Sequence, residues 1–174
     1  EETIFSSGGG GSYYGNTAIG GGNMAIGEGD VGGMQTGGIR VYHWEYDKES
    51  WALDTTIEFY NPDQGWQLRP HLSISDEFLV VANFEQAASQ WWRLYQRGDG
   101  EWPLIAEISS AVSGRHTVIE GNNFYVYKCP TSSGSPGPVI HYRWNGEELE
   151  VVRGITPINH AYESDTYGSS LAMG

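Results

Sequence analysis

The sequence predicts an all-β protein, on three observations. Runs of Val, Ile, Tyr, Trp and Phe are short and are bounded by Gly, Asn, Asp or Pro, which is typical of strands joined by tight turns. No stretch shows the period and caps of a substantial helix, and the one candidate, residues 84–89, is too short to carry a fold. Strand-like groups also recur along the chain. We therefore expect at least about ten short antiparallel strands and no helix longer than about two turns.

Composition limits the classes of function. The chain has 174 residues, of which 39% are hydrophobic, enough for the packed core of one domain. With 9 Lys+Arg against 22 Asp+Glu, it lacks the basic residues needed to bind nucleic acid or anionic membranes without sequence preference. No apolar run is long enough to span a membrane. The single cysteine, Cys129, excludes an internal disulfide, and no Cys/His group has zinc-like spacing.

Three features recur roughly every 50 residues, the period of a repeat protein. They are a strand opening on a polar turn, a tyrosine before a hairpin turn, and a large apolar residue followed six positions later by isoleucine. In order, these lie at Met24, Phe78, Phe124 and Leu171; at Tyr42, Tyr95 and Tyr142; and at Trp51 with Ile57, Trp102 with Ile108, and Leu149 with Ile155. A further apolar run precedes each full repeat, at residues 17–19, 72–74 and 117–119.

Each repeat therefore contains four short strands joined by tight turns, which is the make-up of a β-propeller blade. The predicted blades are residues 17–57, 71–108 and 116–155. Because a single blade cannot bury both of its faces, neighbouring sheets must stack.

The same register assigns part-blades to the two ends of the single domain, 1–174. Residues 1–16 hold the end of a preceding blade and a Gly-rich segment, and residues 161–174 begin a further blade. Four blades close if the two parts complete each other; otherwise the chain is a segment of a larger propeller or a unit that closes by association. Unpaired edge strands favour pairing, so the expected assembly residues are Ile4, Phe5, Leu171 and Met173.

Residues 23–27 and 37–44, continuing to Trp51, read as a small-residue "AIG" strand, a polar loop, a "GIRVYHW" strand and a tryptophan. This segment resembles the FG-GAP repeat of integrin α-subunit propellers and of many secreted algal and bacterial proteins. Residues 142–146 and 94–102 repeat the pattern more loosely. The resemblance implies a propeller fold, an extracellular or cell-surface location and a role in cell adhesion.

The Asp-x-Asp-x-Asp-Gly calcium loop of the integrin repeats is missing from this chain. In its place the first blade offers Glu28 and Asp30, the second Glu85, and the third, at residues 129–138, no carboxylate. Calcium takes six to eight oxygen ligands. We therefore expect calcium at the first blade at most, through Glu28 and Asp30, and no other cofactor.

No residues form a recognisable catalytic pattern. The five histidines are scattered, no HExxH or GxSxG motif occurs, and the acidic residues 47–49 and 147–148 fall in predicted hairpin turns. The sequence thus predicts a protein that is not an enzyme. Residues 97–99 spell the adhesion tripeptide Arg-Gly-Asp, but a hairpin turn favours Gly and Asp for backbone reasons alone.

Aromatic residues exceed the needs of a core of this size. Tryptophan and tyrosine are enriched at protein interfaces and offer flat faces to sugar rings. The candidate binding platform is Trp44, Trp66, Trp91 and Trp144. The sequence therefore predicts a non-enzymatic extracellular structural or adhesive module that associates with a protein partner or with itself. The alternative is a glycan-binding, lectin-like propeller that uses surface Trp and Tyr.

Overall fold

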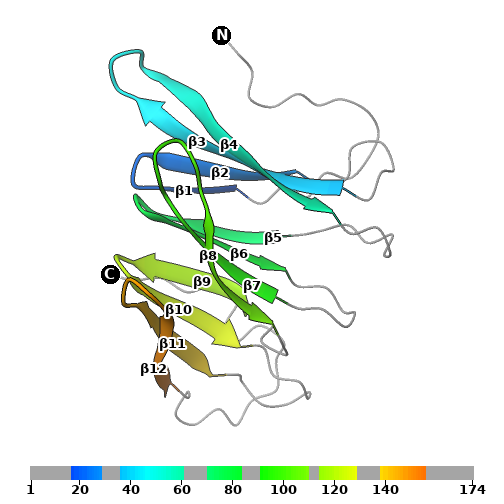
Figure 1. The fold of residues 1–174 in the computed structure, drawn as a ribbon, viewed down its shortest axis with the longest axis vertical. Coiled ribbons are helices and arrows are strands. Elements are labelled where there is room, and N and C mark those ends of the chain that lie inside the picture. The colour runs from blue at the N-terminus through cyan, green and yellow to red at the C-terminus, as the bar shows by residue number, and fades with distance from the viewer. Residues whose placement is uncertain are drawn as a thin grey trace, which may run out of the picture.

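The computed structural model describes residues 17–28, 36–60, 70–83, 91–109, 114–128 and 138–155. Twelve strands in these ranges form three four-stranded antiparallel sheets, which lie one above another in Figure 1. Every regular element of the described ranges is a strand, so the prediction of an all-β fold with at least ten short strands is confirmed. The candidate helix at residues 84–89 lies outside the described residues.

Each sheet corresponds to one predicted blade. Blade 1 comprises β1 (Thr17–Gly20), β2 (Asn23–Glu28), β3 (Thr36–Glu45) and β4 (Ser50–Tyr60). Blade 2 comprises β5 (Pro70–Ile74), β6 (Phe78–Asn83), β7 (Trp91–Gln96) and β8 (Leu104–Ser109). Blade 3 comprises β9 (Gly114–Glu120), β10 (Asn123–Lys128), β11 (Val139–Trp144) and β12 (Leu149–Ile155). The predicted part-blades lie outside the described residues, and with them Ile4, Phe5, Leu171 and Met173.

Neighbouring blades approach most closely along their first strands. β1 contacts β5 and β5 contacts β9, whereas no comparable contact joins the fourth strands of the described blades. Within each blade the strands pair in chain order, from the first strand at the inside to the fourth at the outside. The described sheets therefore stack like blades around one side of the molecule, and the three of them do not close into a ring (Figure 1).

One backbone hydrogen bond recurs in all three blades and sets their common register. The N–H groups of Trp44, Arg97 and Trp144 donate to the carbonyl oxygens of Gly22, Glu77 and Asn122 at 2.8, 2.8 and 2.9 Å. Each bond ties the end of the third strand to the turn between the first and second strands. The residues at these positions are therefore structurally equivalent from blade to blade.

The repeated tyrosines are equivalent in this register, but one of the repeated strand openings is not. Tyr42, Tyr95 and Tyr142 lie opposite Met24, Leu79 and Phe124. The alignment of Phe78 with Met24 and Phe124 was therefore wrong by one residue. β6 is apolar on both faces, so its sequence carries no alternation that would fix which residue faces which side.

A β-bulge also recurs, on the fourth strand of each blade. Asp54, Ile105 and Val152 are the extra residues that have no partner in the ladder beside the repeated tyrosine. The bulge reverses the alternation of the strand. As a result, Trp102 packs toward blade 1 while Ile108, six positions later, packs toward blade 3.

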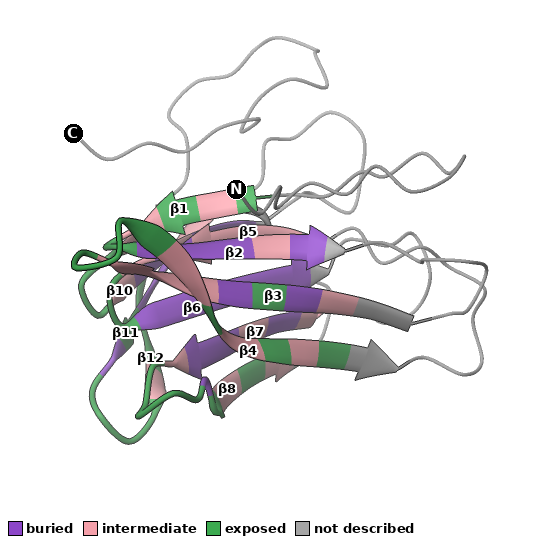
Figure 2. Cartoon of the chain, turned by 90° about the horizontal axis from the view of Figure 1, so that it is seen from above, coloured by how far each residue is buried: buried purple, intermediate pink, exposed green. Residues whose placement is uncertain are grey.

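Each blade has two faces, which we name by their neighbours. The leading face packs on the preceding blade, as in blades 2 and 3, and the trailing face packs on the following blade, as in blades 1 and 2. Figure 2 shows that burial is concentrated on the second and third strands, whereas β4 and β8 carry mostly exposed and intermediate residues. The second and third strands of each blade thus supply most of the buried side chains that hold the stack together.

The first core cluster fills the junction of blades 1 and 2. Trailing side chains from blade 1 meet leading side chains from blade 2. The buried members are Ala25, Ile39 and Val41 from blade 1, with Ile74, Leu79, Val81, Tyr95 and Trp102 from blade 2.

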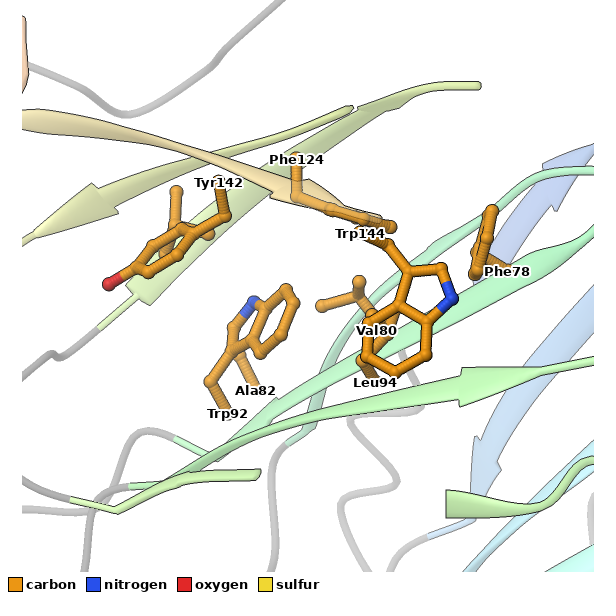
Figure 3. Close-up of a cluster of buried hydrophobic side chains, with 9 residues drawn as sticks. Phe78, Val80, Ala82, Trp92, Leu94, Phe124, Tyr142 and Trp144 are labelled. Carbon is orange, nitrogen blue, oxygen red and sulfur yellow. The ribbon is translucent and has the colours of Figure 1, made fainter. Parts of the chain in front are cut away.

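The second core cluster fills the junction of blades 2 and 3 and is richer in large aromatic rings (Figure 3). Phe124 lies edge-on to Phe78 at 5.3 Å and to Trp92 at 5.9 Å, and Trp92 stacks on Tyr142 at 6.1 Å. The indole N–H of Trp92 donates to the Thr117 hydroxyl at 3.2 Å. Burying a side chain of this size contributes about 1.5–3 kcal/mol, so this junction is a main source of stability.

Candidate functional site

A buried carboxylate lies at the junction of blades 1 and 2. The side chain of Asp54, at the bulge of β4, is only 7% exposed. Its Oδ1 accepts a hydrogen bond from His43 Nδ1, and its Oδ2 accepts one from Trp102 Nε1 at 3.4 Å. Arg97 Nη2 lies 3.7 Å from Oδ2. Because both oxygens have partners and two of those partners belong to blade 2, this group fixes one blade against the next.

The Arg-Gly-Asp tripeptide therefore takes part in blade packing through its arginine. Residues 97–99 lie in the turn between β7 and β8, as the sequence indicated. Asp99 is exposed, whereas the Arg97 guanidinium points toward Asp54.

A second polar contact joins the first turns of blades 1 and 2. Asn23 Nδ2 donates to the carbonyl oxygens of Ser75 at 2.8 Å and Asp76 at 3.2 Å. A Cβ at Gly20 would lie 2.3 Å from Ile74 O, and one at Gly21 would lie 2.3 Å from Asp76 N. Gly21 also has a positive φ of 58°. Only glycine permits the two turns to approach so closely.

The leading face of blade 1 has no described blade against it. Its side chains occupy the positions that form the inter-blade cores in the other two blades. They are Ile19, Met24, Tyr42, Trp44 and Trp51, equivalent to Ile74, Leu79, Tyr95, Arg97 and Trp102 in blade 2 and to Ile119, Phe124, Tyr142, Trp144 and Leu149 in blade 3. Ile19 is 67% exposed, whereas its equivalent Ile74 is 7% exposed. Trp44 and Trp51 lie edge-on at 5.3 Å.

The trailing face of blade 3 is likewise without a described neighbour, and it mixes apolar and polar groups. Val152 and Ile155 are 41% and 40% exposed. Val152 is equivalent to Asp54 in blade 1 and Ile105 in blade 2, and Ile155 is equivalent to Ile57 and Ile108. The three isoleucines at these positions pack against the cores of the described junctions. This face is therefore aliphatic at Val139, Val152 and Ile155, whereas His141 holds the position of the buried core residues Val41 and Leu94.

His141 is the centre of the polar part of this face. Its ring stacks on Tyr125 at 4.6 Å, and its Nε2 lies 2.9 Å from Asn123 Oδ1, which also accepts a hydrogen bond from Arg143 Nε at 3.3 Å. Burial, helped by the charges of Arg143 and Arg153, lowers the pKa of His141. The neutral ring then donates from Nε2, and Nδ1 has no hydrogen-bond partner among the described residues.

The structure does not bring the predicted platform residues together. Trp144 is buried in the second core, and Trp91 is half-buried beneath the Arg93 guanidinium at 4.3 Å from its ring centre. Trp66 lies outside the described residues. Trp44 instead pairs with Trp51, its direct cross-strand neighbour beside the β3–β4 turn. The hairpin spacing of these two tryptophans was the signal in the sequence that could have identified the pair.

Only one of the two predicted calcium ligands lies within the described residues. Glu28 is the last residue of β2, and Asp30 lies outside the described residues. Within the described ranges, no group of three or more His, Cys, Asp or Glu side chains is placed to hold a metal ion. In the same ranges, no helix has the length and apolar character to span a membrane.

No protein-family model matches the chain, and no curated protein sequence matches it. The resemblance to FG-GAP repeats therefore stays a prediction from the sequence.

Proposed function

We propose that the protein is a non-enzymatic extracellular structural or adhesive module that works by protein–protein association. The observation that carries this proposal is the leading face of blade 1. Its residues are mostly of the same types as those that form the inter-blade cores of blades 2 and 3. Met24 is buried, but Tyr42, Trp44 and Trp51 are only half-buried and Ile19 is 67% exposed. Exposed apolar patches of this kind are typical of association sites.

The Trp44–Trp51 pair is the expected centre of the interface. Tryptophan is enriched among the residues that dominate binding energy, because it buries a large area and loses little conformational freedom. Tyr46, 80% exposed in the turn beside the pair, extends the aromatic surface. The extracellular location rests on the resemblance of the repeat to those of secreted propellers.

One feature of the molecule supports the proposal that the protein is not an enzyme. The His43–Asp54 pair has the residue types of an acid–base couple. However, Asp54 faces the junction with blade 2, and its second oxygen is occupied by Trp102 and Arg97. This arrangement suits a packing contact better than a proton transfer to a substrate.

The alternative is a glycan-binding module, and the same tryptophan pair favours it. Two half-buried indole rings beside an exposed tyrosine could stack on the apolar face of a sugar. The two functions predict different ligands for one surface.

A binding experiment separates them. The wild-type chain, Trp51→Ser and the control Leu104→Ser, which changes an exposed residue on the fourth strand of blade 2, are applied to a glycan array and to surfaces carrying immobilised protein. We expect no saturable glycan binding, and protein binding that Trp51→Ser weakens at least about tenfold while Leu104→Ser does not. Saturable glycan binding that only Trp51→Ser abolishes would overturn the proposed function in favour of the alternative.

A further inference from the structure

We infer that the leading face of blade 1 binds the trailing face of blade 3 from a second copy of this chain. This inference rests on the proposed association function and names its partner. Both described junctions join a trailing face to a leading face, so a head-to-tail contact continues the same stack. It covers the exposed aliphatic side chains of Ile19 on blade 1 and of Val152 and Ile155 on blade 3.

The residues at the bulge support this pairing. In the first junction the bulge residue Asp54 meets a leading pair that can donate to it, Arg97 and Trp102. In the second junction the bulge residue is the aliphatic Ile105, and it packs against the core that holds the leading residue Trp144, with Leu149 beside it.

The bulge residue of blade 3 and the leading pair of blade 1 follow the pattern of the second junction. The remaining bulge residue, Val152, is aliphatic and 41% exposed, and the remaining leading pair is Trp44 with Trp51. The core between blades 2 and 3 likewise combines an aliphatic bulge residue with an indole. When blade 3 of one copy meets blade 1 of another, the exposed aliphatic side chain of Val152 is buried against the tryptophan pair.

The first turns of blades 1 and 3 also hold equivalent positions. Asn23 donates to the carbonyl oxygens of Ser75 and Asp76 across the first junction. Asn123 holds the position of Asn23 on the trailing face of blade 3, opposite Arg143 as Asn23 is opposite His43. The carbonyl groups of Gly20 and Gly21 hold the positions of Ser75 and Asp76 on blade 1. Within its own blade Asn123 Nδ2 donates to Glu120 O at 3.3 Å and to Asn122 Oδ1 at 3.2 Å, so a bond to a second copy would replace one of these.

The number of blades makes a closed ring feasible. Each copy contributes three described blades, and two copies joined by two identical head-to-tail contacts give six, within the usual range of about four to eight blades. A rotation that does not close would give an open filament instead.

The decisive experiment copies the Asp54–Arg97 contact into the proposed interface. Val152→Asp places a carboxylate against tryptophan in a second copy, and Trp44→Arg places a guanidinium against valine. Each variant alone should raise the dissociation constant at least about 100-fold, because an unpaired charge is buried. Mixed in equal amounts, the two variants form one charge-matched contact and one wild-type contact, so association should return. Val151→Asp, at a 65% exposed neighbour on the opposite face of β12, is the control and should change little.

Sedimentation over a concentration series measures these effects, and thermal melting shows whether each variant is folded. Self-association of the wild type, loss in both single variants and recovery in the mixture support the inference. Self-association that survives both variants, or that the mixture does not restore, overturns the head-to-tail contact and leaves the association function standing. A monomeric wild type whose melting temperature falls in Val152→Asp assigns the face to other residues of the same chain and overturns the second copy as partner. Neither result involves glycan binding, which tests the proposed function itself.

Discussion

The two junctions between blades share one backbone arrangement and differ in chemistry. Between blades 1 and 2, the bulge residue is the buried acid Asp54, held by Trp102 and Arg97, and Asn23 joins the first turns. Between blades 2 and 3, the bulge residue is Ile105, and the aromatic rings of Phe78, Trp92 and Phe124 fill the space. Buried polar contacts add little net stability but penalise wrong partners, whereas apolar area stabilises without selecting. The comparison suggests that the first junction is the more selective and the second the more stable.

The largest effect that tests this comparison is the removal of one leading side chain from each junction. Phe124→Ala should destabilise the fold by about 3–5 kcal/mol, and its equivalent Leu79→Ala by about 2–5 kcal/mol. Phe124 should be the more costly of the two, since it contacts both Phe78 and Trp92. Urea denaturation monitored by tryptophan fluorescence measures both. A larger loss at Leu79 would contradict the ranking of the junctions.

Converting the polar junction into the apolar type is the next test. Asp54→Ile alone leaves Arg97 and the Trp102 N–H without their acceptor, and Arg97→Trp alone removes the cation beside a buried acid; each should cost about 2 kcal/mol. The double variant copies the pair of Ile105 and Trp144 and should recover most of the loss.

A double-mutant cycle from equilibrium unfolding gives the coupling between the two sites. Additive losses would show that the contact of Asp54 with Arg97 is not what distinguishes the first junction.

Two glycines with nearly the same backbone conformation sharpen the comparison further. Gly21 has a φ of 58° and Gly121 a φ of 56°, but a Cβ at Gly21 collides with Asp76 of blade 2, whereas one at Gly121 meets no described atom within 4 Å. Gly121→Ala should therefore cost only the strain of the left-handed conformation, about 1 kcal/mol, and Gly21→Ala about 2 kcal/mol. Thermal unfolding of the two variants reports the difference. Equal losses would mean that the first turns do not press against each other.

The smallest expected effect is a pH dependence at blade 3. The pKa of His141 is lowered in the folded state, mainly by burial, so the unfolded chain binds a proton more readily. Stability should fall as the pH drops through the ordinary histidine range toward the folded-state pKa. His141→Val, which copies Val41 of blade 1, should remove this component of the slope between about pH 7 and 5. An unchanged slope would show that other groups titrate there.

The sequence predicted the repeat because its strongest markers are local. Tyr42, Tyr95 and Tyr142 each precede a tight turn, and turn residues fix the end of a strand. The position of Phe78 was misjudged because a strand buried on both faces shows no alternation.

The junction contacts could not be predicted in the same way. A bulge at Asp54 changes the face of every later residue in β4, and nothing in the strand's composition announces it. Asp54 meets Arg97 only because blade 2 stacks on blade 1, which is a contact between distant parts of the chain. Trp144 was expected on a surface platform, but it packs in the core between blades 2 and 3, which again is a contact between distant parts of the chain.

The bulge on each fourth strand also bears on solubility. β12 presents Val151, Val152 and Ile155 to solvent along the outer edge of its sheet, and a flat apolar edge of this kind would readily add strands from other chains into aggregates. An extra residue in mid-strand breaks the regular row of N–H and C=O groups and increases the local twist, so an incoming strand can match only part of that edge. The same irregularity that aims Asp54 at blade 2 therefore protects each blade's outer strand against uncontrolled β-sheet growth.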